Sequence, residues 1–316
     1  MSLTYDTLNS ITRELAIVTQ DNVLTSIPLV KYLTQHKLGQ VDGQYIEALT
    51  RYAVPNLTVW DGDADLVPAE TETTTKARYS WAYAYTAQTI SRNHWLAAKQ
   101  KGERAIIGLA KDKMQAMEDG IKLGLDDELF TEYDTPTHTF NSLVDIVKAT
   151  DPTHQASGLG GIKISEAPWW EANVLAYDDS KGDIRWHMQK MLRLCSRIGT
   201  KPDLIMTTGD IIDLYGDEIY SKEGILSQKS IEWGFPNVIP FAGGIPVTDD
   251  DNATSGCMYF LNSNYLSLVV HPDDFFQVSD WRETSTTDLN LIAHITLTAQ
   301  LITSARRGLG IITGIS

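Results

Sequence analysis

The sequence predicts an α+β fold that combines one long helix and one very long strand with a separate α/β lobe. Apolar residues recur every three or four positions between residues 92 and 130, which indicates a single amphipathic helix. Seven apolar residues occupy every second position from Leu289 to Leu301, which predicts a strand of about 45 Å at about 3.3 Å per residue. Between these two elements, helical and strand patterns alternate, as in an α/β unit.

Length, charge and cysteine content exclude several classes of protein. The chain has 316 residues, enough for about two domains at roughly 150 residues each, so it can bury a core without metals or disulfides. Cys195 and Cys257 lack the spacing of a zinc finger or a disulfide scaffold. A net charge of −15 argues against a general nucleic-acid binder. With no signal-peptide pattern and no membrane-spanning run, we expect a soluble intracellular protein without a membrane partner.

The first fifty residues predict an N-terminal arm more than a core element. Leu8, Ile11 and Leu15 follow helical spacing, which indicates one short amphipathic helix. Pro28 and a later cluster of glycines interrupt this pattern, and apolar anchors are few. We therefore expect residues 1–50 to form an arm.

Residues 56–89 predict a long β-hairpin with an acidic tip. Leu57 begins the outgoing strand, and the turn that follows holds three acids: Asp61, Asp63 and Asp65. One face of the returning strand is aromatic: Tyr79, Trp81, Tyr83 and Tyr85. Because the apolar surface lies near the base, the tip cannot be buried against its own domain, and we expect the hairpin to project.

Charge is segregated along the predicted helix at 92–130. Its first half is basic and includes Arg92, Lys99, Lys101 and Arg104, whereas residues 118–128 contain five acids and one lysine. The helix dipole favours the opposite arrangement. Either this is a solvated face on which pairs four residues apart offset the cost, or the basic half contacts an acidic group outside its own domain.

The second lobe is predicted from 160 to 270. Helices are expected at 184–198 and 209–220, and strands at 204–208, 245–247, 258–261 and 266–270. After the long strand, Arg306 to Gly308 forms a break, and a short strand resumes at 309–315.

No cluster of residues predicts a catalytic or metal centre, so we expect neither an enzyme nor a cofactor. The seven histidines show no metal-binding spacing. The glycine run at 158–161 lacks the lysine and the strand–helix context of a phosphate loop, and predicts a flexible loop. Asp249, Asp250 and Asp251 could hold a divalent cation, but calcium-loop spacing is missing, so a solvated acidic turn is the favoured interpretation.

Short motifs follow one another in a fixed order along the second half of the chain. They are GGI at 160–162 with PWW at 168–170, KPDLIMTT at 201–208, FAGGIPV at 241–247, MYFLN at 258–262 and ARRGLGIITGI at 305–315. Together with the hairpin and the long helix, these motifs resemble the major capsid proteins of tailed bacteriophages. That family has the fold named for Hong Kong phage 97.

The resemblance implies a division of the chain. Residues 1–50 would be the N-terminal arm and 51–90 the extended loop, a β-hairpin. Residues 91–159 would hold the spine helix and the first part of the peripheral lobe, and 160–270 the axial α/β lobe. Residues 271–316 would form the C-terminal strands, mainly in the peripheral lobe.

The resemblance also implies a structural function. The chain would be a major capsid subunit that self-assembles, as pentamers and hexamers, into the icosahedral head of a tailed double-stranded DNA phage. It would be assembled in the host cytoplasm and reside in the virion. Its partners would be further copies of itself, with scaffolding, portal and decoration proteins as others, and packaged DNA enclosed without sequence-specific binding. An encapsulin-type nanocompartment shell and a hydrolase with a carboxylate pair assembled in three dimensions stay open as alternatives.

Two expectations about contacts between subunits follow. Some members of the family crosslink a lysine of the extended loop to an asparagine of a neighbour, and Lys76 is the candidate by position. We also hypothesise that acids of the hairpin tip face basic residues of the long helix between subunits. The residues concerned are Asp61, Asp63 and Asp65 on one side and Arg92, Lys99, Lys101 and Arg104 on the other.

Overall fold

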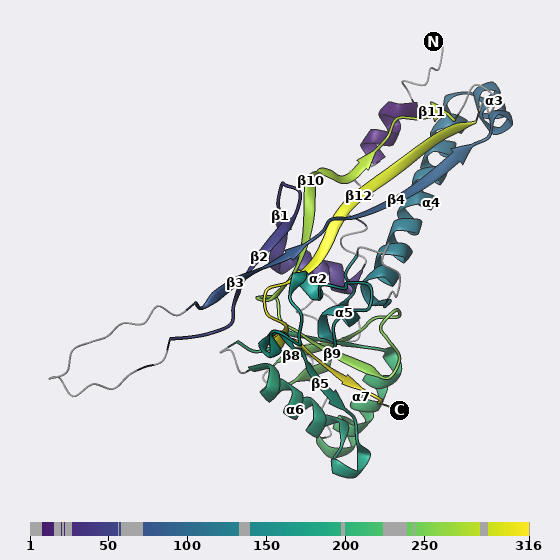
Figure 1. The fold of residues 1–316 in the computed structure, drawn as a ribbon. Helices are drawn as coiled ribbons and strands as arrows, with labels where there is room; N and C mark the ends of the chain where they lie inside the picture. Colours follow the sequence, from purple (N-terminus) through teal and green to yellow (C-terminus); the bar gives the residue numbers. More distant parts are fainter. Residues whose placement is uncertain are drawn as a thin grey trace.

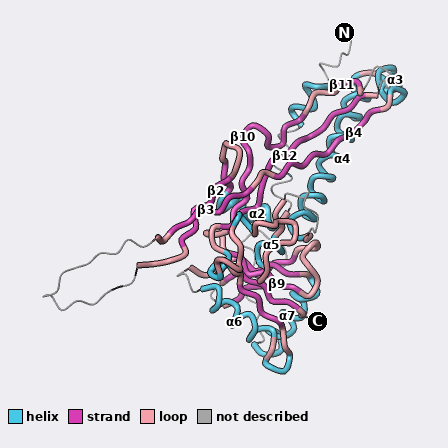
Figure 2. The backbone as a smooth tube through the Cα atoms, viewed as in Figure 1, coloured by secondary structure: helices cyan, strands magenta, loops and turns pink. Residues whose placement is uncertain are grey.

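The computed structural model is elongated, with one sheet in each half and a two-stranded hairpin at the side (Figure 1). It describes residues 8–15, 20, 22, 27–55, 57, 72–132, 140–196, 200–223, 239–242, 244–284 and 290–315. A five-stranded sheet and the longest helix form the narrow half, and a six-stranded sheet with its helices forms the compact half (Figure 2).

The long strand predicted from the alternating pattern is the centre of the five-stranded sheet. β12 (Leu291–Thr303) pairs antiparallel with β10 (Leu266–Val278) on one side and with β4 (Ala82–Ile90) on the other. β1 (Leu38–Gln40) and the short β11 (Arg282–Glu283) complete the sheet. Every second residue from Leu291 to Leu297 is buried, which confirms the predicted strand about two residues later than expected.

The predicted single helix is two helices. α3 (Arg92–Lys101) ends at Gly102, whose φ of 93° favours glycine, and α4 (Glu103–Phe130) begins there. The apolar stripe of α4 is confirmed, because Ala110, Met117 and Ile121 are buried and the helix ends at Phe130 as expected. α4 packs against β4 and also contacts β12, and it runs beside the five-stranded sheet (Figure 2).

The six-stranded sheet confirms the predicted α/β lobe. Its order is β5 (Asn173–Ala176), β13 (Gly310–Thr313), β9 (Cys257–Leu261), β6 (Leu204–Thr207), β8 (Ile245–Asp249) and β7 (Ile239–Phe241). α6 (Ile184–Cys195) packs on β13 and β5. α7 (Gly209–Glu223) follows β6 in the chain and packs on β8, the parallel neighbour of β6. β13 therefore places the end of the chain in this sheet, apart from the other C-terminal strands.

The N-terminal segment is anchored more firmly than its sequence predicted. Residues 8–15 are helical, as expected, and Leu8 is fully buried in a cluster with Ile90. α2 (Pro28–Lys37) packs on β10 and buries Leu29 and Leu33. The expectation of few apolar anchors is wrong here, because the leucines at 29 and 33 share one helix face.

The hairpin differs from the prediction in its partners. β2 (Ile46–Arg51) pairs with β3 (Thr74–Tyr79), so the outgoing strand precedes Leu57, which is 93% exposed. The returning strand is interrupted after Tyr79, and its continuation, β4, joins the five-stranded sheet instead.

A buried arginine lies between the two sheets. Arg306 belongs to η6 (Arg306–Gly308), the turn that connects β12 to β13, and its side chain is fully buried. Its guanidinium donates hydrogen bonds to carbonyl oxygens of Ile146 (2.8 Å), Asp145 (3.2 Å) and Lys148 (2.7 Å), at the C-terminal end of α5 (Leu143–Val147). One apolar cluster extends through this region and contains residues of both sheets.

Candidate assembly surfaces

The β2–β3 hairpin has one buried and one exposed face. Ile46 and Ala77 are buried on the inner face, against η1 (Leu159–Gly161). On the outer face, Glu47 accepts from Lys76 at 2.7 Å and from Arg78 at 3.0 Å, and the hydrogen bond from Lys76 lowers the pKa of Glu47. Lys76 thus lies on the exposed face of the hairpin. Asp61, Asp63 and Asp65 lie outside the described residues.

Close packing fixes the base of the hairpin. The Tyr79 hydroxyl donates to the Thr303 carbonyl at 2.7 Å, and Tyr52 stacks on Trp169 with ring centroids 4.9 Å apart. Gly160 has a φ of 65°, and a Cβ there would lie 2.9 Å from the Cβ of Ala77. The glycine run is therefore a buried support under the hairpin and not the flexible loop that its sequence predicted.

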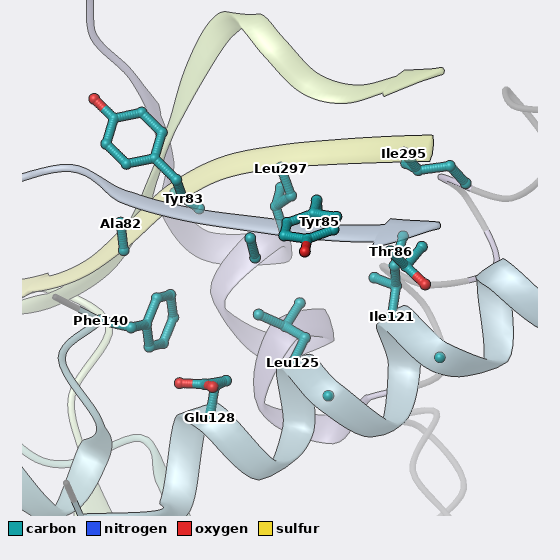
Figure 3. Close-up of a pocket in the computed structure, with 14 residues that line it drawn as sticks. Ala82, Tyr83, Tyr85, Thr86, Ile121, Leu125, Glu128, Phe140, Ile295 and Leu297 are labelled. Carbon is teal, nitrogen blue, oxygen red and sulfur yellow. The ribbon is translucent and has the colours of Figure 1, made fainter. Parts of the chain in front are cut away.

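A groove of about 410 Å³ lies between β4 and α4 (Figure 3). Its walls include Ala82 of β4, Ile121 and Leu125 of α4, and Phe140. Gly124 opens onto empty space, since a Cβ there would meet nothing within 4 Å. Because most of the side chains in its walls are apolar, the groove is mostly apolar.

Two tyrosines of β4 lie at the groove and are exposed. Tyr83 and Tyr85 are each 77% exposed, and Figure 3 shows Tyr83 on the opposite side of β4 from Leu125. The prediction that they share a core face with Tyr79 and Trp81 is wrong, because the strand is interrupted between Tyr79 and Ala82. Of the described strands, only β12 pairs with β4, so the other edge of β4 has no partner strand among the described residues.

The basic residues form an exposed group around the junction of α3 and α4. The four are Arg92, Lys99, Lys101 and Arg104, and within the described part of the chain none has a carboxylate partner. The break at Gly102 changes the dipole argument, because Lys99 and Lys101 occupy the last turn of α3, where positive charge is favourable. Arg92 and Arg104 remain at helix starts, and the last turn of α4 contains no base.

The acidic turn after β8 differs from the expected solvated turn. Asp250 is only 4% exposed and lies near Asp126 of α4. Neither residue lines the groove or the shallow cavity beside Arg13 and Asp280. In the described residues, no three histidine, cysteine or acidic side chains are arranged to hold a metal ion. None of the described helices is both long and apolar enough to span a bilayer.

Comparison with protein-family models and with curated proteins gave no match. Among solved structures, a chain of the cyanophage A-1(L) capsid asymmetric unit is similar with a TM-score of 0.61 at 14% identity, over 92% of this chain and 94% of that chain. The chain has the Hong Kong 97-like fold. A Mycobacterium phage Adephagia structure matches with a TM-score of 0.55 at 10% identity, covering 89% and 88% of the two chains.

The Hong Kong 97-like fold of this chain is also similar to an encapsulin. The holo-SrpI encapsulin complex from Synechococcus elongatus PCC 7942 matches with a TM-score of 0.56 at 11% identity, covering 92% of this chain and 88% of that chain. At 10–14% identity, these likenesses establish the fold of the chain.

Sequence reasoning missed two features of this Hong Kong 97-like chain. The groove depends on Gly120 and Gly124, and two glycines one turn apart in a long helix were a visible signal, since each costs about 1 kcal/mol relative to alanine. The proximity of Asp250 to Asp126 had no signal, because it depends on how the two halves pack.

Proposed function

We propose that this chain is the major capsid subunit of a tailed double-stranded DNA phage, assembling as pentamers and hexamers into an icosahedral head. The observation that carries the proposal is the Hong Kong 97-like fold, similar to a cyanophage capsid chain over nearly its full length. Under the same proposal, residues 51–90 act as the extended loop and 160–270 mainly as the axial lobe.

Exposed apolar surface supports assembly through the hairpin. Leu49 is 65% exposed on the outer face of β2, and Val54 is 76% exposed beyond it. The described residues of the same subunit do not cover these side chains, whereas the groove beside β4 offers an apolar surface on a neighbour. Burial of both on association links subunit stability to assembly. We propose that the hairpin of one copy covers the β4–α4 groove of another.

The net charge of −15 fits the enclosure of DNA without sequence-specific binding. A strongly attractive inner surface would hold the phosphate backbone and hinder packaging and release. Scaffolding, portal and decoration proteins are further proposed partners, and the proposed location is the virion after assembly in the host cytoplasm.

An encapsulin-type shell is the second candidate, favoured by the similarity to the SrpI complex. The two functions differ in what the shell encloses. Particles recovered from cells that naturally express the gene should contain nuclease-protected double-stranded DNA if the chain is a phage coat. An enclosed protein without DNA would favour the encapsulin.

Assembly itself is tested with the purified chain. Light scattering and negative-stain microscopy at high concentration should show capsomers or closed shells. A 35.1 kDa species under every assembly condition would contradict both shell functions.

Filling the groove should reduce assembly without weakening the subunit. In Gly124→Leu the new side chain enters open space in the groove, and the loss of a helical glycine should raise subunit stability by up to about 1 kcal/mol. We expect a severalfold lower yield of shells at fixed concentration, measured by sedimentation. Gly108→Leu is the matched control, since it also meets open space in α4 but lies outside the groove. Equal yields from the two variants would contradict a docking role for the groove.

A further inference from the structure

The last turns of α4 meet the turn after β8 through one asparagine. The Asn252 side-chain amide donates to Oδ2 of Asp126 at 2.7 Å, while the Asn252 backbone N–H donates to Oδ1 of Asp250 at 3.1 Å. The turn is also tied to the sheet, because the Asp250 N–H donates to the Thr207 carbonyl at 3.0 Å. Asp126, Asp250 and Asn252 thus join the longest helix to the six-stranded sheet, and we call them the carboxyl joint.

Each acid of the carboxyl joint has one oxygen that is buried and lacks a donor among the described residues. These atoms are Oδ1 of Asp126 and Oδ2 of Asp250, and Asp250 as a whole residue is only 4% exposed. A buried carboxylate oxygen without a donor is costly in its charged form, whereas a proton would turn one acid into a donor. The two unpartnered oxygens therefore indicate a bound proton in this joint.

The charges around the joint also favour a proton. Asp249 and Asp251 flank Asp250, and Asp127 follows Asp126 in α4. Burial, together with the nearby Asp126 charge, raises the pKa of Asp250 from 3.8 to about 7. Burial likewise raises the pKa of Asp126, although the hydrogen bond from Asn252 opposes this shift.

We propose that the carboxyl joint is a proton-dependent connection between α4 and the six-stranded sheet. With a proton on one acid the joint is closed. When the proton is lost, the negative charge of the buried Asp250 and that of the half-buried Asp126 repel, and the turn at 250–253 separates from α4. The proposal rests on the fold of the subunit and does not depend on what the assembled chain encloses.

The sign of the pH effect follows from proton binding. Because the pKa of Asp250 is higher in the folded chain than in the unfolded chain, the folded chain holds a proton that the unfolded chain has released between about pH 4 and 7. The stabilising effect of that proton is complete below about pH 4 and is lost as the pH rises to about 7. From pH 5 to 8, this contribution should lower the melting temperature of the wild-type subunit by about 3–5 °C.

The test compares two isosteric variants of the full chain. Asp250→Asn cannot lose a proton and offers an amide donor, so it should melt higher than wild type at pH 8 and lack the 3–5 °C loss. Asp251→Asn removes the same charge from the exposed neighbour, whose effect on the pKa of Asp250 is smaller than the effects of burial and of Asp126, so most of the wild-type slope should remain. The seven histidines are common to all three proteins, so their titration cancels in the comparison.

Hydrogen exchange and a carboxyl titration test the proposal independently of the melting temperatures. In wild type, the backbone amides of Asn252 and Ala253 should exchange hydrogen faster at pH 8 than the intrinsic pH dependence of exchange predicts. In Asp250→Asn the exchange of these amides should follow the intrinsic pH dependence. If Asp250→Asn fails to fold, a carboxyl titration of wild type by carbon NMR must still show one aspartate with a midpoint near 7. A wild-type slope retained in Asp250→Asn, or every aspartate titrating below pH 5, overturns the proposal. So does calcium chloride at pH 8 restoring the melting temperature of pH 5, which would indicate a cation site.

Discussion

Arg306→Met should lower the melting temperature of the subunit by roughly 5–9 °C, or prevent its accumulation as soluble protein. The substitution keeps the apolar stem but removes the donors to the carbonyls of Ile146, Asp145 and Lys148. The hydrogen bonds to Ile146 and Asp145 are buried and the one to Lys148 is part-buried. Because a buried carbonyl left without a donor costs about 1–3 kcal/mol, the total loss should be about 3–6 kcal/mol. That loss is large against a typical total stability of about 5–15 kcal/mol. Thermal melts of the purified variants measure it.

The adjacent arginine supplies the control. Arg307 is exposed and makes one long contact of 3.5 Å with the Pro168 carbonyl, so Arg307→Met should change stability by less than about 0.5 kcal/mol. Burial lowers the pKa of Arg306 to about 10, so its guanidinium is still charged at neutral pH. If Arg306→Met and Arg307→Met have the same melting temperature, Arg306 does not connect the two halves of the molecule.

Elements that follow one long periodic pattern were predictable from the sequence. The stripe of α4 and the alternation of β12 each repeat over many residues, so the period survives local exceptions. The break at Gly102 was not predictable, because a lone glycine is also compatible with a continuous helix. What turns the chain there is packing, since Trp95 and Ala98 of α3 are buried in one cluster with Ile90 and Leu291.

Strand partners were the main error, and the reason is physical. Residues 46–51 alternate between buried and exposed positions, but their partner β3 lies beyond a long intervening segment, and pairing at such separation leaves no local signature. The tyrosines of β4 were misplaced for a related reason. Alternate residues share one face only within an uninterrupted strand. Because the strand is interrupted after Tyr79, the tyrosines of β4 need not lie on the same face as Tyr79.

The candidate site likewise contains one feature that the sequence predicts and one that it does not. Exposure of Lys99 and Lys101 is what their charge favours, and both side chains are exposed. Burial of Asp250 does not follow from its sequence neighbours, all of which predict a solvated turn. It results from the contact between the end of α4 and the six-stranded sheet, which only the folded chain creates.

Replacing Asp61, Asp63 and Asp65 with lysine should block assembly and leave the subunit folded. We propose that these acids face the basic group of a neighbouring subunit: Arg92, Lys99, Lys101 and Arg104. The proposal is supported by the exposure of all four bases and by their lack of a carboxylate partner among the described residues. An exposed pair contributes about 0.2–1 kcal/mol, but a shell repeats each pair many times, so small changes per contact alter the yield of shells strongly.

The experiment separates this pairing from a general effect of charge. Assembly is measured by light scattering at low salt, where such pairs are least screened, and folding is measured by circular dichroism. Asp210, Asp213 and Asp217 lie on the exposed side of α7, and their replacement with lysine changes the net charge equally, so it should leave assembly intact. Adding Lys99→Glu and Lys101→Glu to the hairpin variant should partly restore shells, because the charges are then exchanged between the two surfaces. Normal assembly of the hairpin variant at low salt would show that the pairing does not exist, and equal failure of the α7 variant would assign the effect to net charge.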